Sequence, residues 1–386
     1  MLIYVWVMKM QCPRCHNNQA QHLYQINGKY YCRECIPFHQ VYIDETRETK
    51  RMVYSHWKGK YHIGFQLSDK QLSISRQLVE NYKNHKDSLI LAVCGAGKTE
   101  IVFELIQYVL SQGQRVCFCI PRKELVKELY QRIKEAFDID IGLFYGGCQE
   151  NREAQLVICT MHQLYRFENS YGFDLMIADE VDAFPFYQNR VLNEIFERCC
   201  LGNYVKMSAT FVKEDIHHEE VLYMNRRYHG YDLPVPKLIV AKKYLQKLLI
   251  IFLLFGLRKK TIIYVPKIDD VYVLVQYLSH YHLKVAGVSS KHNENQKTIE
   301  QFKNGQLDVL VSTTLLERGM TIEDVQVIIY QGEHSIYRYG TLVQMAGRVG
   351  RKPNAPKGHV YILASYRTKA IQQCIQNIKR SNQMSV

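Results

Sequence analysis

A short apolar run followed at once by a glycine-rich turn constrains this chain more than any other feature. Residues 89–93 are all apolar and indicate a buried strand. The turn that follows, residues 94–97, leads into Lys98 and Thr99, and an amphipathic helix is expected over residues 99–110. A strand, a glycine turn and a helix in this order are typical of the phosphate-binding P-loop. The pattern therefore predicts a nucleotide site on an α/β sheet.

The residues of this turn have the chemistry that a nucleoside triphosphate and its magnesium ion require. Glycines let consecutive backbone N–H groups converge on phosphate oxygens at the positive end of a helix. Lys98 adds a charge near the β and γ phosphates, and the Thr99 hydroxyl can ligate Mg²⁺. Ala92 stands where the usual motif begins with glycine. The candidate nucleotide-binding residues here are Gly95, Ala96, Gly97, Lys98, Thr99 and Glu100.

Composition limits the kinds of partner. The chain has 386 residues, enough for two globular domains and a small one. Lys and Arg number 50 against 37 Asp and Glu, and the net charge of +13 favours nucleic acid or an anionic membrane surface, although a solvated basic surface fits as well. No secretory signal is evident, and the longest apolar stretch, residues 248–257, is too short to span a bilayer and is expected to be a buried helix. We expect a cytoplasmic protein without direct membrane insertion.

Four of the 12 cysteines form a metal-binding pattern near the N-terminus. They are Cys12, Cys15, Cys32 and Cys35. Two Cys-x-x-Cys pairs at this spacing can supply four thiolates to one tetrahedral Zn²⁺, which fits better than a redox pair. Residues 22–32 are expected to be a hairpin that turns at Asn27 and Gly28. We predict a zinc ribbon stabilised largely by its metal. The spacing leaves open whether the ribbon contacts DNA, contacts a protein or only braces the fold.

Strands and helices alternate after the P-loop, which predicts a parallel sheet covered by helices. An apolar strand at residues 175–178 ends in Asp179-Glu180-Val181-Asp182. In a P-loop fold we expect this strand beside the P-loop strand, so that Asp179 can hold Mg²⁺ and Glu180 can orient or deprotonate the attacking water. Gln71, ahead of the P-loop, could bind the adenine edge through its amide, although a surface glutamine is an equally good interpretation.

A change of composition over residues 223–247 indicates a domain boundary. Basic residues in it, including Arg226 and Arg227, could contact phosphates or belong to a solvated linker. Alternating strands and helices then resume without a second P-loop. Near the end of this second part, Arg348 and Arg351 are separated by a glycine-containing turn and could stabilise charge on the γ phosphate.

The order of these motifs resembles that of superfamily 2 helicases. The resemblance covers about residues 65–365 and rests on residues 92–99, 179–182, 208–210, 313–319 and 344–351. Within that superfamily the chain is similar to the late-competence DNA-uptake ATPases of the ComFA type. The features that carry this closer similarity are the four-cysteine ribbon, residues 92–100 and residues 179–185.

This resemblance implies a fold and a set of residue roles. The fold is α/β, with two RecA-like domains at residues 61–230 and 231–386 behind a ribbon and connector at residues 1–60. ATP would lie between the domains, and a single strand would cross both. Carried over by position, Gln71 would contact adenine. Hydrolysis would be coupled to domain movement by Asp182, Ser208 and Thr210, and the ATP site would be closed by Gln344, Arg348 and Arg351. The residues near the nucleic-acid backbone would be Pro121, Arg122, Thr160, Thr313 and Thr314.

The activity implied is ATP-dependent translocation on single-stranded DNA that draws transforming DNA into the cytoplasm. The chain has no long insertion that could act as a strand-splitting wedge, which favours translocation over unwinding. Three alternatives remain: a replication-restart or repair helicase of superfamily 2, an RNA helicase, and a non-catalytic nucleic-acid scaffold. The resemblance also implies competence partners at the uptake channel and in the cytoplasm, through which the protein could associate with the inner face of the membrane.

Overall fold

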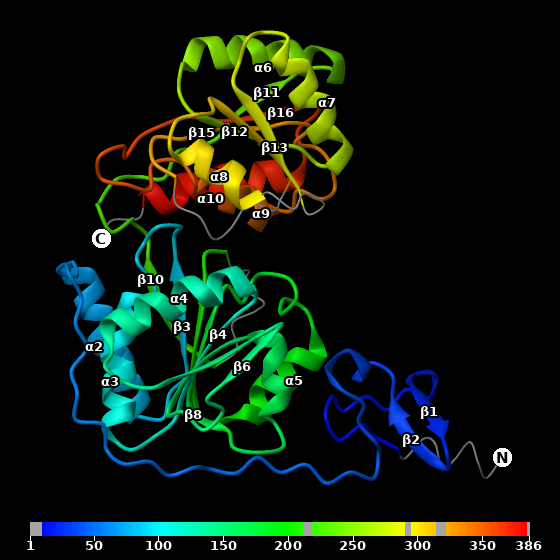
Figure 1. Cartoon of the computed structure of the whole chain (residues 1–386), viewed down its shortest axis with the longest axis vertical. Coiled ribbons are helices and arrows are strands. Elements are labelled where there is room, and N and C mark those ends of the chain that lie inside the picture. The colour runs from blue at the N-terminus through cyan, green and yellow to red at the C-terminus, as the bar shows by residue number, and fades with distance from the viewer. Residues whose placement is uncertain (1–9, 211–217, 290–294, 314–321, 384–386) are drawn as a thin grey trace. The chain divides into compact units, whose positions relative to one another are not determined.

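The computed structural model describes residues 10–210, 218–289, 295–313 and 322–383 (Figure 1). The chain forms two compact units. One consists of Met1–Ile90 and Thr99–Leu222, and the other of Leu91–Lys98 and Tyr223–Val386. The domain boundaries expected after residues 60 and 230 remain predictions.

The first unit begins with the predicted hairpin. Strands β1 (Leu23–Ile26) and β2 (Lys29–Cys32) pair antiparallel. The turn residues Asn27 and Gly28 have φ angles of 48° and 79°. Both lie in the left-handed region that a two-residue hairpin turn requires, which is why an Asn-Gly pair is a strong turn signal. Short 3-10 helices flank the hairpin, η1 at Ala20–His22 and η2 at Ile36–Phe38.

The main body of the first unit is an eight-stranded sheet in the order β10-β3-β9-β8-β4-β7-β5-β6. The strands are β3 (Ser88–Ala92), β4 (Val116–Ile120), β5 (Ile141–Tyr145), β6 (Cys148–Glu150), β7 (Leu156–Thr160), β8 (Phe173–Asp179), β9 (Cys200–Ser208) and β10 (Glu220–Met224). The helices are α2 (Asp69–Lys83), η3 (Glu100–Val102), α3 (Phe103–Ser111), α4 (Lys123–Ala136), η4 (Met161–Arg166) and α5 (Arg190–Cys199). All five residues of β4 are buried, as expected for a strand covered on both faces. The predicted α/β fold is confirmed.

The strand order corrects one expectation. Strand β8, which ends at Asp179, does not lie beside β3, because β9 occupies the position between them. Strands β8 and β9 run parallel, with Asp179 opposite Met207. The acidic motif and Ser208 therefore end at the same edge of the sheet. An apolar run in the sequence indicates a buried strand but does not show which other strand lies beside it.

The helix expected over residues 99–110 is also divided. Its first turn is the 3-10 helix η3, and the α-helix α3 begins only at Phe103.

Further upstream, α2 begins with a capping box in which the Ser68 hydroxyl accepts the Gln71 N–H and the Gln71 amide oxygen accepts the Ser68 N–H. Gln71 is thus buried and fixed at a helix start rather than exposed on the surface.

The second unit contains a six-stranded sheet in the order β11-β16-β15-β12-β14-β13, and these neighbours pair in parallel. Its strands are β11 (Lys237–Val240), β12 (Thr261–Tyr264), β13 (Val285–Val288), β14 (Val309–Ser312), β15 (Gln326–Ile329) and β16 (Val360–Ala364). Its helices are α6 (Lys243–Leu257), α7 (Ile268–Ser279), α8 (Asn295–Lys303), α9 (Tyr339–Ala346) and α10 (Lys369–Gln383).

The apolar stretch at residues 248–257 lies in α6, which is only partly buried. Ile250 and Leu254 are buried, whereas Leu248, Phe252 and Phe255 are exposed. Only one face of α6 packs against the sheet side of its unit, although the sequence is apolar on all faces. The expectation of a buried helix is therefore wrong for the outer face. In the part of the chain that the structure describes, no helix is both long and apolar enough to cross a membrane.

Candidate functional site

The P-loop follows β3 and turns at two glycines. Gly95 and Gly97 have φ angles of 84° and 75°, in the region that glycine occupies without strain. The Ala96 N–H donates to the Val93 carbonyl at 3.1 Å, which closes the turn. Thr99, at the start of η3, is buried. The loop therefore has a defined backbone conformation, with its N–H groups followed directly by a helical turn, as phosphate binding requires.

The acidic motif turns sharply at the end of β8. Glu180 has a φ of 56°, which is uncommon for a residue with a side chain and directs the chain away from the strand. The Glu180 N–H donates to Asp179 Oδ1 at 2.7 Å. This contact holds the Asp179 carboxylate beside its own backbone at the strand end. The two acidic side chains thus leave the sheet at one point, where water and Mg²⁺ chemistry is expected.

Asp182 is joined to the end of β9. The Thr210 hydroxyl donates to the Asp182 carboxylate, and Ser208 Oγ donates to the Thr210 carbonyl at 2.6 Å. The Thr210 N–H in turn donates to Ser208 Oγ at 3.0 Å. Ser208 and Thr210 are both buried. The structure therefore brings together the three residues expected to couple hydrolysis to movement, while their coupling role stays a prediction.

The nucleic-acid candidates of the first unit share one edge of its sheet. Strands β4 and β7 are parallel neighbours, and Ile120 lies opposite Thr160. Pro121 and Arg122 follow β4 directly, so they leave the sheet at the same edge as Thr160. Thr313 follows β14 in the second unit, and Thr314 lies outside the described residues.

The arginine motif of the second unit is built around a buried cation that the sequence did not reveal. Arg227 is 2% exposed, and its Nη1 donates to the Val349 carbonyl at 2.6 Å and to the Gly350 carbonyl. Its Nη2 donates to the Gly347 carbonyl at 3.4 Å. Burial lowers the pKa of Arg227 to about 10. Arg227 is therefore neither a solvated linker residue nor free to contact phosphates, because its donors hold the turn that carries Arg348.

Gln344, Arg348 and Arg351 lie on and just after α9. Gln344 and Arg348 are buried, and Arg351 is partly exposed with its Nε donating to the Gly347 carbonyl at 3.0 Å. Within the same unit the Cys94 thiol donates to Gln344 Oε1 at 3.6 Å. The two arginines therefore sit on one ordered turn. Their expected action on the γ phosphate stays a prediction.

This turn predicts a contrast between two glycine substitutions. Gly350 and Gly305 have φ angles of 71° and 75°. A Cβ at Gly350 would overlap the Pro356 carbonyl and lie 2.8 Å from Arg227 Nη1, whereas a Cβ at Gly305 meets nothing within 4 Å. We expect Gly350→Ala to destabilise the protein by about 1–3 kcal/mol more than Gly305→Ala, measured by urea unfolding, because only Gly350 adds steric overlap to the backbone strain. Equal effects would show that the turn is not tightly packed.

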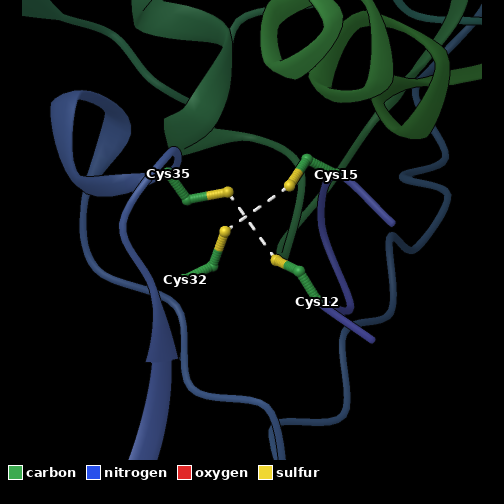
Figure 2. A group of neighbouring side chains, drawn as sticks. All are labelled: Cys12, Cys15, Cys32 and Cys35. Carbon is green, nitrogen blue, oxygen red and sulfur yellow. Dashed lines mark hydrogen bonds between the residues drawn. The ribbon is translucent and has the colours of Figure 1, made fainter. Parts of the chain in front are cut away.

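The four cysteines of the ribbon converge on one point (Figure 2). Their sulfur atoms all lie within 4.8 Å of one another, and the Cys12–Cys35 and Cys15–Cys32 Sγ–Sγ distances are both 3.7 Å. A tetrahedron with Zn–S bonds of about 2.3 Å has S–S edges of about 3.8 Å. All four cysteines are buried. The donor set and its spacing therefore fit a closed, four-thiolate metal site without room for a substrate.

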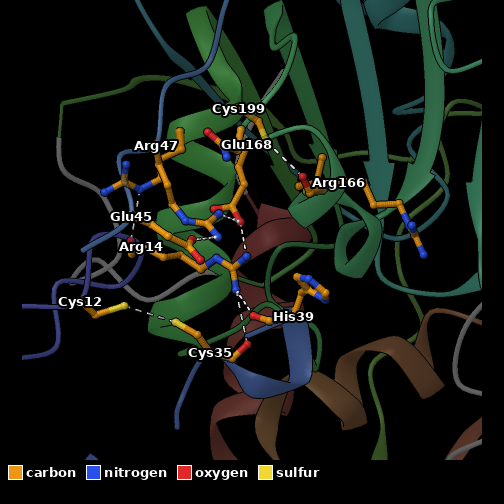
Figure 3. Close-up of polar contacts among 12 residues, drawn as sticks. Cys12, Arg14, Cys35, His39, Glu45, Arg47, Arg166, Glu168 and Cys199 are labelled. Carbon is orange, nitrogen blue, oxygen red and sulfur yellow. Dashed lines mark hydrogen bonds and ion pairs between the residues drawn. The ribbon is translucent and has the colours of Figure 1, made fainter. Parts of the chain in front are cut away.

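The ribbon is anchored to the first RecA-like domain by a buried ion-pair network (Figure 3). Arg14, between two of the cysteine ligands, forms an ion pair with Glu168, and its Nη1 donates to the His39 carbonyl at 2.8 Å. Arg47 Nη1 lies 2.8 Å from Glu168 Oε1. The side chains of Arg14 and Glu168 are 1% and 0% exposed. One carboxylate thus holds two guanidinium groups from the N-terminal segment.

Further contacts make the ribbon continuous with this domain. The Phe38 ring stacks on His162 of η4, with centroids 5.6 Å apart. Burial lowers the pKa of His162, so the neutral ring faces Phe38 at neutral pH. The Arg198 Nε of α5 donates to the Arg14 carbonyl at 3.2 Å. The ribbon therefore braces the segment that directly follows Thr160, whatever else it binds.

The network predicts that Glu168 has a large effect on stability. Glu168→Ala removes the carboxylate that compensates the burial of Arg14, while Arg47 keeps its ion pair with Glu45. We therefore expect a loss of about 3–5 kcal/mol in the free energy of unfolding. Glu194→Ala is the matched control, because Glu194 pairs with the exposed His16. The control should cost about 0–1 kcal/mol. Similar losses for both variants in urea unfolding would contradict the anchoring role of Glu168.

Comparison with known proteins places the chain in a family. Residues 64–213 match the family model "Type III restriction enzyme, res subunit", and residues 242–353 match "Helicase conserved C-terminal domain". S. cerevisiae Dbp5 bound to RNA and ADP BeF3 has a similar structure, with a TM-score of 0.58 at 18% identity, covering 82% of this chain and 91% of Dbp5. This structural likeness shows the fold alone.

Two curated relatives extend over nearly the whole chain. The competence protein ComFA of Streptococcus pneumoniae is 30% identical, covering 97% of this chain and 90% of the relative. The competence protein ComFA of Bacillus subtilis is 31% identical, covering 98% of this chain and 86% of the relative. With the helicase domains and the four-cysteine cluster in place, the chain belongs to the ComFA family of competence proteins and is an ATP-hydrolysing DNA helicase or translocase of superfamily 2.

Proposed function

We propose that this protein moves along single-stranded DNA in steps driven by ATP and thereby draws transforming DNA into the cell. The observation that carries the proposal is the alignment of 97–98% of the chain with two competence proteins. The P-loop, the acidic turn at Glu180 and the turn at Arg348 supply the matching chemistry in the chain itself. The preference for a single strand and for translocation over unwinding is the part that needs a test.

We assign the hydrolysis step to residues at the three motifs. Lys98 would bind the β and γ phosphates, and Thr99 and Asp179 would hold the magnesium ion, which supplies charge neutralisation on those phosphates. Glu180 would orient the attacking water and accept its proton. Arg348 and Arg351 would stabilise the charge that develops on the γ phosphate, as arginine fingers do.

The coupling of hydrolysis to DNA is proposed to run through the first sheet. Asp182 lies two residues after Glu180 and accepts a hydrogen bond from Thr210, which lies just after β9. Loss of the γ phosphate that moves Glu180 would therefore also change the geometry of the hydrogen bond between Asp182 and Thr210. Thr160 and Arg122, at one edge of the same sheet, would contact the DNA backbone, which makes binding independent of sequence and sensitive to salt.

Displacement of a blocking protein separates translocation from unwinding. The substrate is single-stranded DNA carrying biotin at one end with bound streptavidin, and a second substrate is a short duplex with a single-stranded tail. We expect ATP-dependent displacement of streptavidin from one of the two ends, with little duplex separation. Efficient unwinding of the tailed duplex would instead favour the repair-helicase alternative. If the protein neither displaces streptavidin from DNA nor unwinds the DNA duplex, but unwinds an RNA substrate, the RNA-helicase alternative would be favoured.

We extend the proposal to the four-cysteine metal site and to the competence partners of the protein. We infer that the four-cysteine site holds Zn²⁺, because thiolates and a closed tetrahedral arrangement suit that ion. We also propose that competence partners, at the uptake channel and in the cytoplasm, deliver and receive the strand, and that any association with the inner face of the membrane occurs through them. The net charge of +13 suits both DNA and an anionic surface, so it does not distinguish them.

A further inference from the structure

One face of the ribbon hairpin carries a row of tyrosines. In the pairing of β1 with β2, Tyr24 lies opposite Tyr31, and Ile26 lies opposite Lys29. Tyr31 also forms a bridge with Tyr42 on its other side. Residues directly opposite one another in a sheet point to the same face. Tyr24, Tyr31 and Tyr42 therefore stand side by side, and we call this surface the tyrosine face.

Packing buries only part of the tyrosine face, because Tyr31 and Tyr42 are partly buried and Tyr24 is exposed. Leu23 and Cys32, which alternate with the tyrosines, point to the other side and are buried against the metal site. On the tyrosine face, by contrast, Tyr24 is 42% exposed and Ile26 is 49% exposed. The Tyr24 and Tyr31 ring centroids are 6.4 Å apart. The hairpin thus presents aromatic and apolar area to solvent while its structural side faces the cysteines.

Two cations lie against these rings. The Arg33 guanidinium carbon is 4.5 Å from the Tyr24 ring centroid, and Lys29 Nζ is 5.8 Å from the Tyr42 ring centroid. Aromatic rings that stack on bases, combined with cations that pair with phosphates, are the usual elements of a surface for single strands. An anionic partner without planar groups would use Lys29 and Arg33 but not the exposed ring of Tyr24.

The hairpin is also held in a fixed position on its domain. Arg14 and Glu168 anchor the ribbon, and Phe38 stacks on His162, two residues after Thr160. A strand bound along the edge that carries Thr160 would therefore meet a ribbon with a defined orientation rather than a tethered module. A site on such a ribbon can retain the strand while the helicase domains change their grip.

We propose that the tyrosine face is a second binding site for single-stranded DNA, separate from the ATP-coupled site of the helicase domains. The choice of DNA as the ligand rests on the function proposed above. Base stacking on Tyr24 and phosphate contacts with Lys29 and Arg33 supply its affinity. Its contribution is retention of the strand between steps, so its loss weakens binding and shortens runs without slowing hydrolysis at saturating DNA.

Substitutions on the two faces of the hairpin test the proposal in the full-length, zinc-loaded protein. Tyr24→Ser removes the exposed ring, and Arg33→Gln removes its cation. Gln25→Ala is the matched control, because Gln25 is exposed in the same strand but points to the opposite face. Affinity for a fluorescent oligothymidylate is measured by anisotropy at one fixed salt, together with zinc content and ATP hydrolysis at saturating oligothymidylate.

We expect Tyr24→Ser to weaken binding of oligothymidylate by about 5–100-fold, the effect of one stacked base, and Arg33→Gln to weaken it and to reduce the salt dependence. Zinc content and the saturated rate of hydrolysis should match those of the wild type, and Gln25→Ala should match it throughout. A photoreactive oligonucleotide with 5-iododeoxyuridine should crosslink to the peptide containing residues 23–33. Unchanged affinity in both variants and no crosslink in this peptide would overturn the proposal.

The outcomes also separate this inference from the function it rests on. Wild-type protein whose ATP hydrolysis is stimulated by single-stranded DNA, with hairpin variants that bind normally, would overturn the tyrosine face alone. Wild-type protein that neither binds single-stranded DNA nor responds to it would overturn the proposed function and this site together.

Discussion

Replacement of Lys98 by alanine is expected to lower the rate of ATP hydrolysis by about 10²–10³-fold, the usual cost of removing one group that stabilises a charged transition state. Lys98 follows Gly97 in a P-loop whose turn is closed by the backbone hydrogen bond from Ala96 to Val93, so we expect the turn to persist in the variant. Because Lys98 is assigned to phosphate and not to DNA, affinity for single-stranded DNA without nucleotide should remain close to that of the wild type.

Lys86→Ala is the matched control for this experiment. The Lys86→Ala substitution also removes one positive charge, but it does so outside the P-loop. The Lys86 side chain is 54% exposed and pairs with the exposed Glu220. It should hydrolyse ATP at the wild-type rate. Steady-state hydrolysis and anisotropy binding are measured for both variants. A Lys98→Ala variant that loses DNA binding to the same degree as hydrolysis would contradict the role assigned to Lys98.

Replacement of Cys12 by alanine is expected to release zinc and destabilise the first unit. Structural zinc sites of this kind contribute about 10–16 kcal/mol of apparent binding free energy at neutral pH, and loss of one thiolate opens the closed tetrahedron. The four cysteines belong to one hydrophobic cluster with Phe167 and Phe196 of the helicase domain. Loss of the metal should therefore lower the melting temperature of more than the ribbon itself.

Cys148→Ala provides the control for the metal site. Cys148 lies on β6, outside the four-cysteine cluster, and is only partly buried. Elemental analysis of this variant should give one zinc per chain, as expected for the wild type, and Cys12→Ala should give much less. A zinc content that is the same in Cys12→Ala and in the wild type would refute the four-thiolate site.

Local signals predicted the parts of the fold that depend on near neighbours in sequence. The pair Asn27-Gly28 fixed the hairpin because both positions require positive φ angles. The glycines of the P-loop and the acidic end of β8 were likewise evident, since backbone geometry and strand ends are local properties. The relation of the chain to ComFA proteins followed from the order of such motifs and is confirmed by the comparisons.

The features that the sequence did not reveal depend on contacts between distant residues. Glu168 and Arg227 are ordinary charged residues in sequence, and only the fold shows that one anchors the ribbon and the other holds the arginine turn. The position of β9 between β3 and β8 is likewise a property of the whole sheet. The roles of the site residues, from Gln71 to Arg351, stay predictions until variants are measured.

The most direct test of the central claim is steady-state ATP hydrolysis at one fixed salt concentration with no nucleic acid, single-stranded DNA, duplex DNA or single-stranded RNA. We expect strong stimulation by single-stranded DNA and little by RNA or duplex DNA. Preferential stimulation by RNA would contradict a role in DNA uptake and would leave only the two-domain ATPase. Hydrolysis that no nucleic acid changes would contradict the coupling of ATP to DNA altogether.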